Sequence, residues 1–155
     1  MRKHQTIALA AISTLAVSAG RFVLGGGWLA EKPDTVTGRW YSAAMVADGS
    51  HLFAENCAVC HGASGEGAAN WQQRGADGFF PPPPLNGSGH AWHHPLRVLR
   101  TFIERGGTAS GGAMPAFANQ LNSRQHDAVI AYMQSRWPDE IYRIWAQKVE
   151  RINTD

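Results

Sequence analysis

Cys57 and Cys60 are the two cysteines of this chain, and a histidine, His61, follows them directly. Two cysteines at this spacing can form a disulfide or a redox-active dithiol. The histidine that follows favours a third chemistry, covalent attachment of c-type haem, in which each thiol bonds one vinyl group of the porphyrin. The next residue is then held beneath the iron, so the spacing predicts His61 as an axial ligand.

The opposite face of such an iron needs a second ligand if the metal is to be six-coordinate, and a methionine thioether is suitable. Met114 is the candidate, because it lies 53 residues after His61 in a glycine-rich stretch and is followed by Pro115. Glycine permits a tight path around the porphyrin edge, and proline stiffens the next step. Met45 lies too close to the cysteines to reach the opposite face, and Met133 lies on an apolar helical stripe.

A histidine-rich stretch from Gly87 to Pro95 is the second candidate for metal chemistry. Its three histidines, His90, His93 and His94, have side chains that can bind a second metal such as copper. The glycines before them and the proline after them disfavour the single helix that would align these side chains. We therefore expect a loop that enters the next helix, with His94 at the N-cap of that helix.

Apolar patterns predict the helices that must position these residues. The stretch 43–57 leads into the cysteines, 95–107 begins with proline and ends with glycine, and 122–137 repeats apolar residues at helical spacing. Ser123 is the expected N-cap of the third helix. A further helix is expected in 138–155. Its apolar stripe consists of Ile141, Ile144, Trp145, Val149 and Ile152.

Length and composition are those of one globular domain with extensions. The chain has 155 residues, of which 44% are hydrophobic and 17% charged. The 17 glycines and 8 prolines predict long loops and short helices. Residues 31–155 carry 11 Lys and Arg against 12 Asp and Glu, a net charge of −1 (11 − 12), so we expect no binding to nucleic acid.

The N-terminus has the pattern of an export segment. Two basic residues precede an apolar run over residues 6–19, which suits a cleaved signal peptide. If the apolar segment continues to Ala30, it is long enough to be a membrane anchor. Both alternatives place the rest of the chain outside the cytoplasm. The expected organisation is a signal peptide or anchor over 1–30, a linker over 31–42, a domain over 43–137 and an amphipathic helix over 138–155.

From Gly49 to Trp137 the chain resembles the class I c-type cytochromes, and among them bacterial single-haem proteins. The resemblance rests on the strings "RWYS", "CAVCH", "PPPPLNGSGHAWHHP", "MPAF" and "WPDEIY". It implies an all-α fold, the small class I cytochrome c fold, with short helices wrapped around one covalently bound haem. It also implies that Tyr132 packs against Gly49 and Phe53 where the first and last helices cross.

The resemblance further implies roles for three residues near the cofactor. The carbonyl of Pro83 would accept the N–H of His61, although the run of four prolines leaves this register open by one residue. Leu85 would lie against the porphyrin, and the indole of Trp92 would donate to a haem propionate. His90 and His93 are left without an assigned role.

These features predict a carrier rather than an enzyme: a protein with one haem c that moves electrons singly between respiratory partners. A membrane oxidoreductase or a terminal oxidase would be such a partner, on the periplasmic side of the bacterial inner membrane. Two alternatives stay open. One is a peroxidase-like haem enzyme in which Met114 can leave the iron, and the other is a metal-handling protein that uses His90, His93 and His94.

Overall fold

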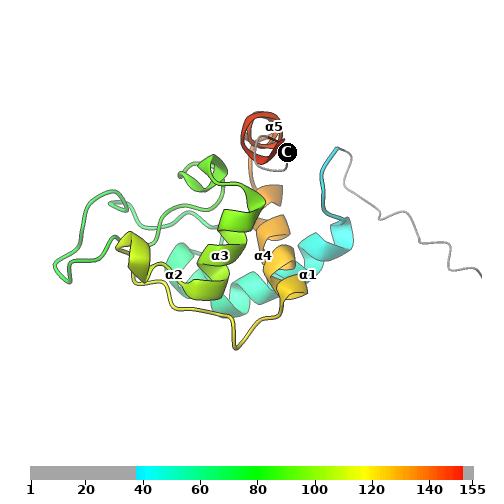
Figure 1. The fold of residues 1–155 in the computed structure, drawn as a ribbon. Coiled ribbons are helices and arrows are strands. Elements are labelled where there is room, and N and C mark those ends of the chain that lie inside the picture. Colours follow the sequence, from blue (N-terminus) through cyan, green and yellow to red (C-terminus); the bar gives the residue numbers. More distant parts are fainter. Residues whose placement is uncertain (1–37, 152–155) are drawn as a thin grey trace, which may run out of the picture. The chain divides into compact units, whose positions relative to one another are not determined.

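The computed structural model describes residues 38–151, which form helices joined by long loops (Figure 1). In chain order these are α1 (Ala43–Asn56), α2 (Ala58–His61), η1 (Ala91–His93), α3 (Leu96–Arg105), η2 (Thr108–Ser110), α4 (Ser123–Ser135), α5 (Asp139–Ile144) and η3 (Trp145–Glu150). Between residues 38 and 151 there is no β-strand, and Phe80 forms an isolated bridge with Gly112. The prediction of an all-α fold is confirmed.

Some predictions concern residues outside the described range. The signal peptide or anchor over residues 1–30 is one of them, and so are the first part of the linker, 31–37, and the apolar residue Ile152. Within the described range, no helix has the length and hydropathy needed to cross a bilayer.

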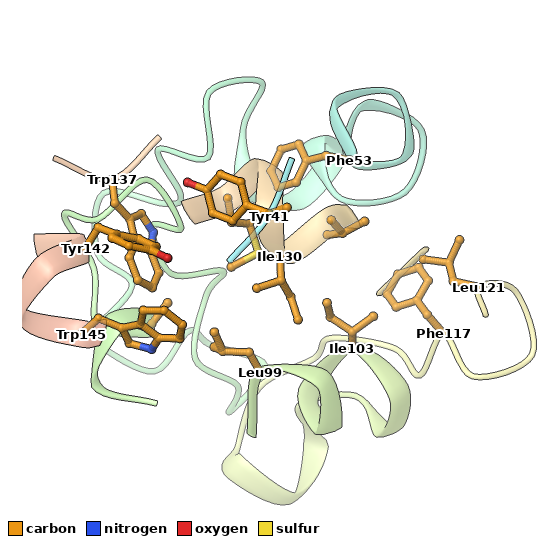
Figure 2. Close-up of a cluster of buried hydrophobic side chains, with 14 residues drawn as sticks. Tyr41, Phe53, Leu99, Ile103, Phe117, Leu121, Ile130, Trp137, Tyr142 and Trp145 are labelled. Carbon is orange, nitrogen blue, oxygen red and sulfur yellow. The ribbon is translucent and has the colours of Figure 1, made fainter. Parts of the chain in front are cut away.

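The crossing of α1 and α4 lies at the core of the described domain (Figures 1 and 2). Gly49 is the point of closest approach, because a Cβ atom at this position would lie 1.9 Å from the backbone oxygen of Ala128. One turn further along α1, the ring of Phe53 packs against that of Tyr132, with 5.1 Å between their centroids. This is the helix crossing that the resemblance implied.

The first residue of α4 is set by a capping box. The side chain of Asn122 accepts the backbone N–H of Gln125, and the side chain of Gln125 accepts the backbone N–H of Asn122. The prediction of Ser123 as N-cap is therefore wrong by one residue. Asn122 has the extended backbone that an N-cap requires, whereas Ser123 is already helical.

This cap gives a first prediction. We expect Asn122→Ala to lower the free energy of unfolding by about 1 kcal/mol, since the backbone N–H of Gln125 loses its side-chain acceptor. Ser123→Ala is the matched control and should change it by less than about 0.5 kcal/mol. Urea unfolding of the two variants measures the difference. A larger loss for Ser123→Ala than for Asn122→Ala would contradict the assigned cap.

The N-cap of α3 also differs from the prediction. Pro95, not His94, holds the cap position, with an extended backbone and a carbonyl that accepts the N–H groups of Val98 and Leu99. His94 instead ends η1, where its N–H donates to the carbonyl of Ala91. Because proline has a φ compatible with the cap, the helix begins one residue later than expected. At the other end, the C-cap is Gly106, the first of the two glycines that end the predicted stretch 95–107.

The C-terminal helix packs on the rest of the described domain. Trp145 is 1% exposed, and its indole donates to the carbonyl of His94 over 2.8 Å. The carboxylate of Glu150 accepts the N–H of Leu96, the first residue of α3, over 2.6 Å. Tyr142, which the predicted stripe omitted, is buried beside Trp145 (Figure 2). This segment thus holds the histidine-rich loop and the start of α3.

The part of the expected linker that the structure describes, residues 38–42, is packed rather than extended into solvent. Tyr41 is 1% exposed, and its burial raises the pKa of the phenol to about 12. The guanidinium of Arg39 lies 4.0 Å from the ring of Tyr142, donates to the Tyr41 hydroxyl and pairs with Asp139. The aromatic and cationic side chains of these residues thus contact α5, and the boundary of the linker at residue 42 stays a prediction.

Candidate functional site

The two cysteines and the histidine lie at the junction of α1 and α2. Cys57 follows the last residue of α1 and donates its N–H to Phe53, while Cys60 and His61 belong to the four-residue helix α2. Both thiols are free, Cys57 half-buried and Cys60 exposed. Burial, with a smaller effect of Cys60, raises the pKa of the Cys57 thiol to about 11. One helical turn therefore presents two free thiols and one imidazole.

The His61 ring is 7% exposed, and its Nδ1 lies 2.9 Å from the carbonyl oxygen of Pro83. A carbonyl can only accept, so this contact places the proton on Nδ1 and leaves the lone pair on Nε2. Burial lowers the pKa of His61, and the contact with Pro83 opposes this to a smaller extent. The imidazole is therefore neutral. The contact also resolves the register within the proline run, in favour of Pro83.

The segment that carries Pro83 is held from two sides. On one side the N–H of Leu85 donates to Gly65 over 2.7 Å, and Ala68 donates to Pro82 over 2.9 Å. On the other side the indole of Trp137 donates to the carbonyl of Leu85 over 2.8 Å. Leu85 itself is half-buried and packs against the core. The carbonyl that orients the imidazole therefore belongs to a fixed stretch of backbone.

Met114 lies in the loop that follows η2. Its carbonyl accepts the N–H of Gly107 over 3.0 Å, and a Cβ atom at Gly106 would lie 2.6 Å from the same oxygen. Gly106 also has a φ of 82°, which side chains rarely adopt. The side chain of Met114 is partly buried against the hydrophobic core. The two glycines at the end of α3 thus allow the methionine loop to fold back closely onto this helix.

These donors fit a covalently attached porphyrin. Two free thiols lie on one turn beside a buried imidazole whose Nε2 is available. The cytochrome c family model matches residues 46–137, more than half of the chain. The chain belongs to the cytochrome c family. Family membership implies covalently bound haem c, and Cys57, Cys60 and His61 form the C-x-x-C-H attachment motif.

One similar protein is the Cbb3-type cytochrome c oxidase subunit CcoP of Azospirillum sp. (strain B510). It is 28% identical to this cytochrome c chain over 101 residues, which are 65% of the chain and 32% of the relative. The match therefore spans about a third of the length of that subunit. No solved structure gives a significant match.

The histidine-rich loop of this cytochrome c chain is built from stacked rings. His90 stacks on Trp71 with a centroid distance of 5.2 Å and lies 5.6 Å from His94, while His93 stacks on Trp92 at 3.8 Å. Desolvation lowers the pKa of His90 and of His94, and neighbouring histidines add to this effect.

A second metal site in this loop has no structural support. Among residues 38–151 no group of three or more His, Cys, Asp and Glu side chains is arranged to hold a metal ion. His90 lies beside His94 but stacks on Trp71, and His93 stacks on Trp92. Trp92 is half-buried and packs against the core, and its bond to a haem propionate stays a prediction.

Two residues near the site were missed by sequence reasoning. The indoles of Trp137 and Trp145 donate to the carbonyls of Leu85 and His94, over separations of 52 and 51 residues. From the sequence alone, both tryptophans are expected only on apolar helical stripes. No spacing pattern indicates which backbone carbonyl an indole will reach.

Proposed function

We propose that this chain is an electron carrier that moves one electron at a time, with His61 and Met114 as the axial ligands. Haem c, when bound, supplies a one-electron Fe(III)/Fe(II) couple. The observation that carries the proposal is the hydrogen bond from His61 Nδ1 to the Pro83 carbonyl. It leaves Nε2 as a neutral donor atom, and such a bond orients a ligating imidazole and raises its basicity.

The surroundings of the site support a carrier rather than an enzyme. The imidazole of His61 is buried, and the loop of Met114 is held against the end of α3 by Gly107. Two axial ligands held in this way would keep the coordination geometry of the iron similar in its two oxidation states. They would also leave no open coordination position for a substrate. A methionine ligand also raises the reduction potential.

The partners we propose are redox proteins of a respiratory chain, such as a membrane oxidoreductase or a terminal oxidase. The similar protein is named as a subunit of a cytochrome c oxidase, and this name supports the proposal of an oxidase as partner. Such redox encounters are usually small and weak. The basic residues and apolar run of the N-terminus favour the periplasmic side of the inner membrane, as an anchored or a processed protein.

Carbon monoxide tests the proposal directly. We expect the reduced holoprotein to resist carbon monoxide and to show the charge-transfer band of a methionine–iron bond when oxidised. The reason is that two strong ligands occupy both axial positions. Rapid carbon monoxide binding by the unmodified protein would overturn the proposal in favour of a peroxidase-like enzyme.

A further inference from the structure

Trp137 is linked to the axial imidazole by a short chain of contacts. It lies between α4 and α5, is 3% exposed, and donates its indole N–H to Leu85. Leu85 is two residues after Pro83, and the carbonyl of Pro83 accepts Nδ1–H of His61. The Trp137 indole is thus joined to the His61 imidazole through the backbone of residues 83–85.

This stretch of backbone has little room to move. The N–H groups of Leu85 and Asn86 donate to the buried carbonyl of Gly65 on one side. On the other side a Cβ atom at Gly87 would lie 2.9 Å from the ring of Pro138 and 3.3 Å from the backbone of Trp137. The stretch is therefore confined between two parts of the chain, and Trp137 belongs to one of them.

Proline makes the link stiff. Pro82, Pro83 and Pro84 precede Leu85, and their rings fix φ, so a shift at Leu85 cannot be absorbed by rotation about these bonds. A displaced Leu85 would move the Pro83 carbonyl and weaken its contact with His61. We propose that Trp137 is a positioning residue for the axial histidine, an inference that rests on the assignment of His61 as iron ligand in the proposed function.

Trp137 also packs in the core, 6.0 Å from Trp145, so a loss of stability alone would not test its role (Figure 2). Trp40 offers a matched control. Its indole is also a donor, but to the side chain of Gln134 over 2.6 Å, and not to the segment of Pro83. Replacing either tryptophan by phenylalanine removes one indole N–H and keeps an aromatic ring.

The experiment compares Trp137→Phe with Trp40→Phe in the reduced holoprotein. Solvent exchange of the His61 Nδ1 proton, measured by NMR, should be about tenfold faster in Trp137→Phe, since a buried hydrogen bond is weakened. The midpoint potential should rise, because a weaker bond to the carbonyl makes the imidazole a poorer donor to iron. Trp40→Phe should leave both quantities at their wild-type values. If Trp137→Phe shows the wild-type exchange rate of the Nδ1 proton and the wild-type midpoint potential, the inference is overturned.

A second variant keeps the test open if Trp137→Phe does not fold. Gly87→Ala retains the indole and displaces the same segment through its contact with Pro138. It should change exchange and potential in the same direction, and wild-type values would again overturn the inference. Carbon monoxide binding by the wild-type protein would instead contradict the assignment of Met114. The two failures are distinguishable, because the Nδ1 proton reports on His61 whatever occupies the sixth position.

Discussion

Gly49→Ala is expected to lower the stability of the folded holoprotein severely. The added Cβ atom would lie 1.9 Å from the carbonyl oxygen of Ala128 and 2.5 Å from its carbon. Both are backbone atoms of α4 and cannot turn away, so the two helices must separate. Separation would also unpack Phe53 from Tyr132. Overpacking of a core commonly costs 1–3 kcal/mol, and a clash between backbones at its centre should cost more than about 4 kcal/mol.

Urea unfolding of the purified holoprotein measures this effect. Gly112→Ala is the control, because a Cβ atom at Gly112 would meet its nearest neighbour at 3.6 Å, an ordinary contact. We expect the control to stay within about 0.5 kcal/mol of wild type. A wild-type unfolding midpoint for Gly49→Ala would mean that α1 and α4 do not approach each other as closely as the structure has them.

Met114→Leu is expected to open the iron to carbon monoxide. Leucine has a volume similar to that of methionine, so the packing cost should stay below about 1.5 kcal/mol, but it has no thioether to offer the metal. The charge-transfer band should disappear, the midpoint potential should fall, and the reduced protein should bind carbon monoxide rapidly. Absorption spectroscopy and a redox titration follow these changes.

Met133→Leu is the matched control for that variant. Met133 is buried on α4, 6% exposed, and is expected to fill space only. It should keep the wild-type spectrum and potential. Loss of the band in Met133→Leu, with Met114→Leu unchanged, would reassign the sixth ligand.

The sequence predicted best the features that depend on neighbours along the chain. Cys57, Cys60 and His61 carry their chemistry in their spacing, whereas the packing of Gly49 and Phe53 on the last helix was implied by the family resemblance. The N-caps of α3 and α4 were harder to predict, because two adjacent residues can each act as the N-cap. Ser123 and His94 were each wrong by one position, since backbone conformation at Asn122 and Pro95 decided the helix starts.

Contacts between distant segments were beyond prediction for a different reason. Nothing in the local pattern of Arg39 indicates that its guanidinium will lie over Tyr142. The same is true of the indole of Trp137, whose acceptor lies 52 residues earlier. Such contacts follow from the packing of whole helices, and a single sequence contains no local signal for their partners.

The pairing of α1 with α4 has a consequence for the order of events during synthesis. The partners of α1 and of Arg39 emerge late, and Asp139 is 100 residues after Arg39. Closing loops of this length costs conformational entropy, and long-range contacts slow folding. Until α4 is complete, α1, which leads into Cys57, lacks the side chains of α4 against which it packs. The packed core beside the haem-attachment motif therefore forms only after the residues of α4 have been made, although Cys60 stays exposed in the completed fold.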